Sequence, residues 1–197
     1  MKKKTKRTLI EYGIMAAVIL TLYLTGLHTE VIGFAQRGLL ATGLMNPKTE
    51  ARANKVSDSS GEIADFNFEL INSAGETVSL EQFKGKVIFM NLWATWCPPC
   101  IAEMPTIQKL YHDVKNENVE FIMLSLDENF ETAKSFRINK GYDFEIYRVA
   151  KGLPQMYHSS SIPTTFVIDA EGKLAMTHKG MADYSTKKFK SFLLDLQ

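Results

Sequence analysis

Two neighbouring segments after residue 86 differ in how their apolar residues are spaced. The segment Val87–Trp93 is apolar throughout except at Asn91, as is typical of a strand that is buried on both faces of a sheet with parallel neighbours. From Pro98 to about Val114 the apolar residues recur every three or four positions, which predicts a helix. These residues are Ile101, Met104, Ile107, Tyr111 and Val114.

Shorter apolar segments predict the remaining elements. Alternation or short apolar runs predict strands at 66–70, 77–78, 121–126, 144–147, 164–168 and 174–177. Helical spacing predicts a turn at 80–83, a helix at 130–140 and a final helix whose apolar face holds Phe189, Phe192, Leu193 and Leu196. Strands that alternate with helices, followed by a hairpin and a closing helix, indicate an α/β layered fold.

The amino terminus has the composition of a membrane anchor. Five of the 23 basic residues lie between Lys2 and Arg7, and an apolar run of 19 residues, 9–27, follows with Glu11 as its only charge. We therefore predict a cytoplasmic tail at 1–8 and a single transmembrane helix at 9–27 with the amino terminus inside. The alternative is a cleaved signal peptide, for which Gly33-Phe34-Ala35 offers a small-x-small pattern. Both interpretations place the domain on the extracytoplasmic (periplasmic) side.

Residues 31–45 are mainly apolar, interrupted by Gln36, Arg37 and three glycines, as in an amphipathic helix on the membrane surface or an extension of the anchor, whereas 46–62 have the polar composition of a linker. We interpret 28–62 as a juxtamembrane segment and linker, and 63–197 as one domain. Beyond the basic tail, 22 acidic residues outnumber 18 basic ones. Since a nucleic-acid surface needs a basic stripe on the folded domain, we predict no nucleic-acid partner.

The two cysteines of the chain, Cys97 and Cys100, form a C-x-x-C motif between the buried strand and the helix. Two cysteines are too few for a disulfide scaffold or a zinc site, and this placement predicts dithiol/disulfide exchange. Cys97 lies at the predicted helix start, where backbone N–H groups stabilise a thiolate. We therefore expect Cys97 to attack and Cys100 to resolve; the alternative is a pair of purely structural cysteines.

Two prolines separate the cysteines. Pro98 and Pro99 have no N–H, so two donors that could stabilise the Cys97 thiolate are missing. The N–H of Cys100 remains. We expect a thiolate that is only modestly stabilised, and therefore a couple tuned toward reduction.

Several motifs together resemble the TlpA/ResA-like family of membrane-anchored, thioredoxin-fold thiol-disulfide oxidoreductases. They are Phe83–Val87, Asn91–Cys100, Glu103-Met104-Pro105 and Ile162–Asp169 followed by Gly172. The resemblance implies a thioredoxin-like α/β fold, with a central mixed sheet flanked by helices. It also implies that Pro163 forms a cis-proline loop that faces Cys97. We expect Trp96, Pro98, Pro99, Ile162 and Pro163 to bind the substrate.

Three acids are candidates for the proton acceptor of Cys100. Thioredoxins usually carry an acid six residues before the first cysteine, where this chain has Asn91. Glu103 follows Cys100 by one helical turn, and Asp127 and Glu128 follow a strand whose carboxyl end should face the active edge. Each of the three is a candidate for proton transfer, and a solvated surface acid is the alternative for each.

The resulting prediction is an extracytoplasmic reductant of disulfides in exported proteins, with apocytochrome c maturation as one candidate pathway. Its redox group is the Cys97–Cys100 disulfide, without a cofactor or metal, and its partners are exported protein thiols or disulfides and a membrane electron donor. A disulfide oxidase or isomerase is the first alternative. A copper-binding or delivery module is a weaker one, because the four scattered histidines offer no obvious third ligand.

Overall fold

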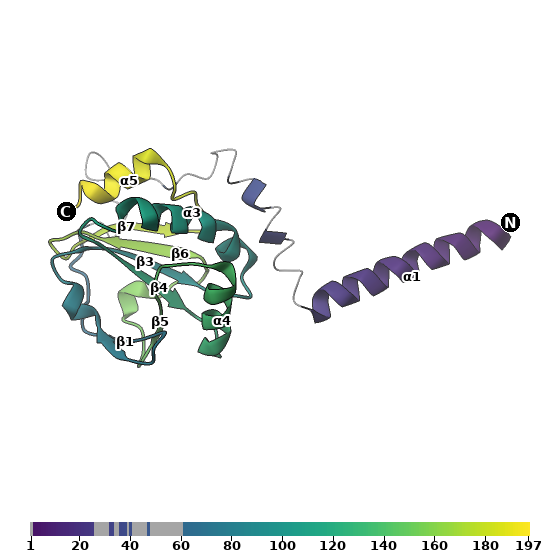
Figure 1. Cartoon of the computed structure of the whole chain (residues 1–197), viewed down its shortest axis with the longest axis horizontal. Helices are drawn as coiled ribbons and strands as arrows, with labels where there is room; N and C mark the ends of the chain where they lie inside the picture. Colours follow the sequence, from purple (N-terminus) through teal and green to yellow (C-terminus); the bar gives the residue numbers. More distant parts are fainter. Residues whose placement is uncertain (1, 26–31, 34–35, 39, 41–46, 48–60) are drawn as a thin grey trace.

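A mixed sheet with the strand order β2-β1-β5-β4-β3-β6-β7 forms the centre of the molecule (Figure 1). The computed structural model describes the chain except for residues 1, 26–31, 34–35, 39, 41–46 and 48–60. The strands are β1 (Glu69–Asn72), β2 (Thr77–Ser79), β3 (Val87–Trp93), β4 (Val119–Ser125), β5 (Ile146–Val149), β6 (Thr164–Ile168) and β7 (Leu174–Lys179). The helices are α1 (Lys2–Leu24), α3 (Pro98–Val114), α4 (Phe130–Lys140) and α5 (Lys187–Leu194), with 3-10 turns η1 (Leu80–Phe83) and η2 (Gln155–Tyr157).

The centre of the sheet combines parallel and antiparallel pairs. Strand β3 runs parallel to β4, and β4 runs parallel to β5, while β3 pairs antiparallel with β6. Because β3 is followed by α3 and β4 by α4, the carboxyl ends of these strands and the first turns of both helices meet at one edge. This edge carries the C-x-x-C motif.

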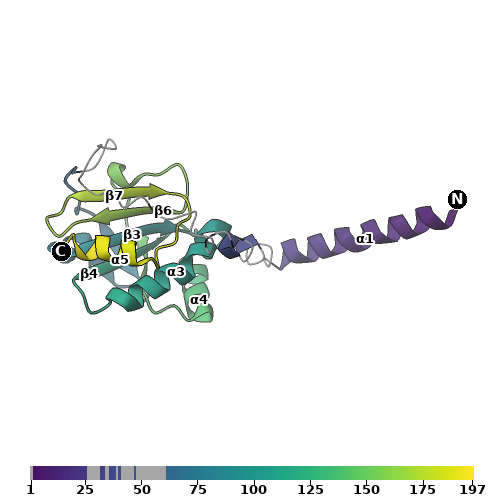
Figure 2. The ribbon, with the colours of Figure 1, turned by 90° about the horizontal axis from the view of Figure 1, so that it is seen from above.

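The two faces of the sheet are covered differently. On one face, α3, α4 and α5 pack against the odd positions of β3, such as Phe89 and Trp93, and Figure 2 shows these helices over the sheet. On the other face, Ile88, Met90 and Leu92 pack against Phe66 and the two 3-10 turns. The predicted α/β fold is confirmed, with helices on one face and shorter segments on the other.

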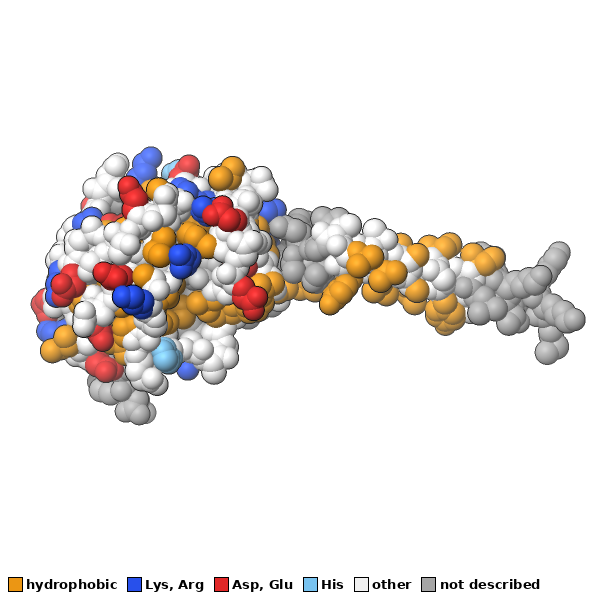
Figure 3. Space-filling model, turned by 90° about the horizontal axis from the view of Figure 1, so that it is seen from below, with side chains coloured by type: hydrophobic (Ala, Val, Ile, Leu, Met, Phe, Trp, Pro, Cys, Tyr) orange, Lys and Arg blue, Asp and Glu red, His pale blue; other side chains and the backbone are white. Residues whose placement is uncertain are grey.

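Helix α1 covers most of the segment for which a membrane anchor was predicted. It begins within the basic segment, and most of its described apolar side chains are exposed (Figure 3). Across the described residues, no helix combines the length and the apolar character that a bilayer crossing requires. The transmembrane helix predicted at 9–27 is therefore not supported by the described residues; α1 ends at Leu24, and residues 26 and 27 of the predicted span lie outside the described part of the chain.

The predicted segment 28–62 lies largely outside the described residues, as does most of the predicted signal-peptidase pattern at 33–35. At the start of the described domain, the N–H of Gly61 donates to the carbonyl of Leu174 at 3.0 Å, and Ile63 forms a bridge with Lys173. The division of the chain into four segments stays a prediction.

Candidate active site

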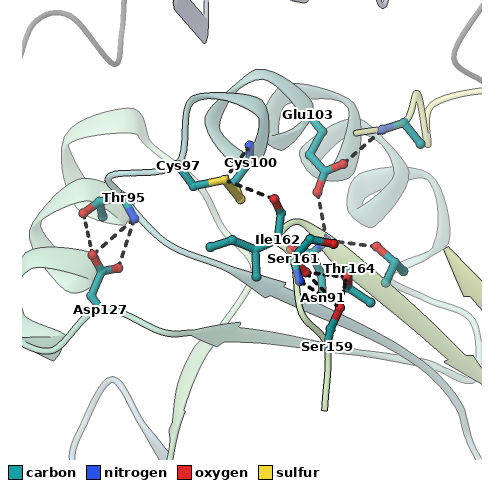
Figure 4. The surroundings of a disulfide bond; sticks show 12 residues. Asn91, Thr95, Cys97, Cys100, Glu103, Asp127, Ser159, Ser161, Ile162 and Thr164 are labelled. Carbon is teal, nitrogen blue, oxygen red and sulfur yellow. Dashed lines mark hydrogen bonds between the residues drawn. A yellow bond between two sulfur atoms is a disulfide. The ribbon is translucent and has the colours of Figure 1, made fainter. Parts of the chain in front are cut away.

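Cys97 and Cys100 are joined by a disulfide at the start of α3 (Figure 4). Their Cα atoms are 5.3 Å apart. Cys97 is the N-cap residue of α3, and Pro98 is its first helical residue, where the fixed φ of proline suits a helix. The prediction that the motif opens a helix is confirmed.

The sulfur of Cys97 has two polar neighbours. The backbone N–H of Cys100 donates to Cys97 Sγ at 3.3 Å, while Pro98 and Pro99 supply no donor. On the other side, Cys97 Sγ lies 3.8 Å from the carbonyl oxygen of Ile162. The peptide bond from Ile162 to Pro163 is cis, as the resemblance implied.

The loop that presents Ile162 is held by hydroxyl groups. Ser159 Oγ donates to the carbonyl of Ser161 at 2.9 Å, and Thr164 Oγ1 donates to the same carbonyl at 2.8 Å. Figure 4 shows Ser159 and Thr164 close to Ile162. These bonds restrain the loop whose next carbonyl faces the sulfur.

The side chains around the disulfide differ strongly in exposure. Trp96 is 59% exposed, whereas Cys97 is 4% and Cys100 0% exposed. Pro98, Pro99 and Ile162 are half-buried, and Pro163 is buried. Trp93, by contrast, lies in the core. Both cysteines are buried; Cys97 is slightly the more exposed of the two, and it follows an exposed apolar ring in the sequence.

Glu103 is fully buried on α3, one turn after Cys100. Its Oε1 accepts from Asn91 Nδ2 at 2.9 Å, and its Oε2 accepts from the backbone N–H of Ala182 at 3.1 Å. Burial raises the pKa of Glu103 to about 8, although both hydrogen bonds act to lower it. A carboxyl group of this kind holds a proton at neutral pH and can release it.

The contacts of Glu103 continue into a buried polar network. Asn91 Nδ2 also donates to Thr165 Oγ1 at 2.9 Å, and the same oxygen accepts from Tyr184 Oη at 2.7 Å. Burial raises the pKa of Tyr184 well above its ordinary value, so its hydroxyl remains a donor. Asn91 and Thr165 are direct partners in the β3/β6 register.

Asp127 follows β4 and binds the loop before Cys97. Its Oδ1 accepts from Thr95 Oγ1 at 2.6 Å, and the backbone N–H of Thr95 lies 3.1 Å from Oδ2. Ser125 Oγ also donates to Oδ2, at 2.9 Å. Glu128, the next residue, is exposed. The sequence placed these acids at the correct edge but indicated neither the depth of Glu103 nor the partners of Asp127.

Sequence reasoning missed Thr95, Thr165, Tyr184 and the backbone of Ala182. The polar Asn91 within an apolar strand was the one available signal that a buried polar partner existed. In the described part of the chain, histidine, cysteine and acidic side chains form no group of three or more that could hold a metal ion.

The chain is similar to proteins of known family. Residues 60–177 match the model of the AhpC/TSA family. The chain is 36% identical over 126 residues to the thiol-disulfide oxidoreductase ResA of Halalkalibacterium halodurans, covering 62% of this chain and 71% of that protein. It is 33% identical over 139 residues to ResA of Bacillus subtilis, covering 67% of this chain and 77% of that protein.

A solved structure agrees with these matches. The crystal structure of StoA from Bacillus subtilis superposes with a TM-score of 0.54 at 27% identity, covering 64% of this chain and 94% of that one. The fold is thioredoxin-like, with the cysteine pair at the start of a helix on a mixed sheet. The chain therefore belongs to the AhpC/TSA family, and it is a thiol-disulfide oxidoreductase similar to ResA.

Proposed function

We propose that this protein reduces disulfides in exported proteins outside the cytoplasm, with Cys97 as the attacking thiol and Cys100 as the resolving thiol. The observation that carries the assignment is the asymmetry of the pair. Cys97 caps α3 beside the exposed Trp96, whereas Cys100 is fully buried. The small exposure of Cys97 beside this ring makes it the more accessible of the two to a substrate sulfur.

The reaction begins with the reduced pair. The Cys97 thiolate attacks one sulfur of the substrate disulfide, forms a mixed disulfide, and releases the other substrate sulfur as a thiolate. The N–H of Cys100, 3.3 Å from Cys97 Sγ, stabilises the attacking thiolate. Trp96, Pro98 and Pro99, together with the loop at Ile162 and Pro163, form the surface against which the substrate lies.

The second step closes the Cys97–Cys100 disulfide. The Cys100 thiol transfers its proton to the ionised carboxylate of Glu103, and the resulting thiolate attacks Cys97 Sγ. The second substrate sulfur leaves as a thiolate, so that two electrons have passed from the pair to the substrate. Glu103 suits this role because it lies one turn from Cys100 and, with a pKa of about 8, has an ionised fraction that can accept the thiol proton and that grows as pH rises above neutral.

We assign proton transfer to Glu103 rather than to Asp127 or Glu128. Donors from Thr95 and Ser125 already occupy both oxygens of Asp127. Glu128 lies at an exposed position. Of the three acids, Glu103 is the one that combines burial with a place on the helix that carries Cys100.

The direction of the reaction follows from the prolines. Between the two cysteines, one backbone donor reaches Cys97 Sγ, since proline has none. A weakly stabilised thiolate makes the dithiol the stronger reductant. Equilibration with glutathione buffers tests this directly. We expect the Cys97–Cys100 couple to lie below about −200 mV, and a value near the roughly −120 mV of strong oxidants would point to an oxidase instead.

The extracytoplasmic location rests on the sequence of the amino terminus, where a basic segment precedes an apolar run. A membrane electron donor would then return the disulfide to the dithiol, and exported proteins, including apocytochrome c, would be the substrates. Because the chain has two cysteines, a membrane-impermeant maleimide added to reduced intact cells should label it through these residues. A Cys97→Ser/Cys100→Ser variant is the matched control; labelling that requires cell lysis would overturn the location.

A further inference from the structure

The carboxylate of Asp127, which follows β4, binds the turn that precedes Cys97. The N–H of Cys97 donates to the carbonyl of Ala94 at 3.2 Å, which closes a turn over residues 94–97. Thr95 is the second residue of this turn and donates to Asp127 through both its backbone N–H and its hydroxyl. Figure 4 shows Asp127 and Thr95 facing each other beside the disulfide.

The register of the sheet explains why these residues meet. Strands β3 and β4 are parallel, and Trp93 lies opposite Ser125. The N–H of Leu126 donates to the carbonyl of Trp93 at 2.8 Å, so the pairing continues by one bond beyond the strands. The segments that follow therefore run side by side and bring Asp127 against Thr95.

Both oxygens of the Asp127 carboxylate accept hydrogen bonds from this turn. Among the described residues, the hydrogen bonds to the Asp127 carboxylate come from uncharged donors, namely Thr95 and Ser125. Ser125 Oγ in turn accepts from the backbone N–H of Asp127 at 3.1 Å, which fixes the acid itself. Hydrogen bonds to an ionised acceptor are stronger than those between neutral groups, so a half-buried Asp127 adds a restraint to the turn that the Cys97–Ala94 backbone bond closes.

We propose that Asp127 is a positioning residue for the thiol-disulfide reaction: by fixing Thr95 it fixes the turn that aims Cys97 at its substrate and at Cys100. The assignment does not depend on the direction of the reaction or on its location. It predicts that loosening the turn lowers the effective concentration of Cys97 toward Cys100, and slows the attack of Cys97 on an external disulfide.

Four variants test the proposal in the full chain. Asp127→Asn keeps the shape and replaces one acceptor oxygen with a donor, while Thr95→Val removes the hydroxyl without changing any charge. Thr95→Ser is the matched control because it keeps the hydroxyl. Glu128→Gln removes the neighbouring exposed charge, and therefore measures the effect of charge alone.

Two readouts separate positioning from stability: the glutathione equilibrium of the cysteine pair, and the rate constant for reaction of the reduced protein with a small aromatic disulfide. For Asp127→Asn and Thr95→Val we expect the equilibrium constant for closing the disulfide to fall about tenfold, which raises the potential by about 30 mV. The rate constant should fall by about tenfold or more. The double variant should be no worse than Asp127→Asn alone, since both changes break the same contact.

Thr95→Ser should stay within about twofold of the wild type, because its hydroxyl can make the same bond. The proposal is overturned if Glu128→Gln shifts the equilibrium as much as Asp127→Asn does. It is equally overturned if Thr95→Val lowers only the unfolding temperature and leaves potential and rate unchanged. Should Asp127→Asn fail to fold, the comparison of Thr95→Val with Thr95→Ser decides the question alone, with the same expected values.

Discussion

Replacing Glu103 with glutamine should change how the stability of the protein depends on pH. Burial raises the pKa of Glu103 from 4.5 to about 8. In the unfolded chain this carboxyl loses its proton near the ordinary value, so between these two pH values the unfolded state binds fewer protons than the folded state. The free energy of unfolding therefore falls as pH rises through this window.

The size of the effect follows from the shift. With about 1.36 kcal/mol for each pKa unit, a rise from 4.5 to about 8 corresponds to about 5 kcal/mol across the whole window. About 3 kcal/mol of this stability is already lost when the pH rises from 4.5, the ordinary pKa, to neutral. The Glu103→Gln variant carries a neutral side chain of the same shape at this position, and it should lack this dependence.

Urea unfolding of the oxidised protein at five values from about pH 5 to about pH 9 measures the effect. At the acidic end the variant should be less stable by about 1 kcal/mol, because an amide group places one N–H where the carboxyl accepted a bond. The order should reverse at about pH 6, because the wild type loses about 1.4 kcal/mol per pH unit in this window, and at neutral pH and above the variant should be the more stable protein. Glu128→Gln, at an exposed position, is the control and should follow the wild type. A difference between Glu103→Gln and wild type that does not vary with pH would refute the reasoning.

Three further outcomes follow from the same site. In a single-turnover reaction, closure of the mixed disulfide should accelerate as pH rises through about 8, the pKa of Glu103, and this rise should disappear in Glu103→Gln; an unchanged profile would exclude Glu103 as the proton acceptor. Trp96→Ala should raise KM for a protein disulfide by about tenfold while thermal stability changes little, since the ring is 59% exposed; unchanged KM would remove Trp96 from the binding surface. Tyr184→Phe should cost about 1 kcal/mol in urea unfolding by removing the bond to Thr165, and a neutral result would contradict the network.

The sequence predicted some elements to the residue and others only approximately. The bounds of β3, β6, α3 and α4 agree with the predictions: the two strands are continuous apolar runs, α3 has a clear helical spacing, and α4 is bounded by the Asn129 N-cap and by Gly141 in the left-handed conformation. The first strand was predicted at 66–70 but begins at Glu69. There, the N–H of Asn67 bonds to Asp65 Oδ1 at 2.8 Å, so a local polar bond replaces the ladder although the alternation of apolar residues continues.

The active site, too, could be predicted from the sequence only in part. The cysteine pair and the helix start could be predicted because they depend on neighbours in sequence. The partners of Glu103 could not, since Ala182 lies 79 residues away and Thr165 lies 74 residues from Asn91. Burial of an acid by distant segments leaves no local pattern, and the surface acid was an equally reasonable interpretation of Glu103.

The reactivity of the two cysteines tests the central claim most directly. Reduced Cys100→Ser and Cys97→Ser variants would each react with a small aromatic disulfide, and release of the aromatic thiol would report the rate. We expect the Cys100→Ser protein, which retains Cys97, to react at least about tenfold faster and to keep the adduct as a stable mixed disulfide. Equal rates, or faster reaction through Cys100, would contradict the assignment of Cys97 as the attacking thiol.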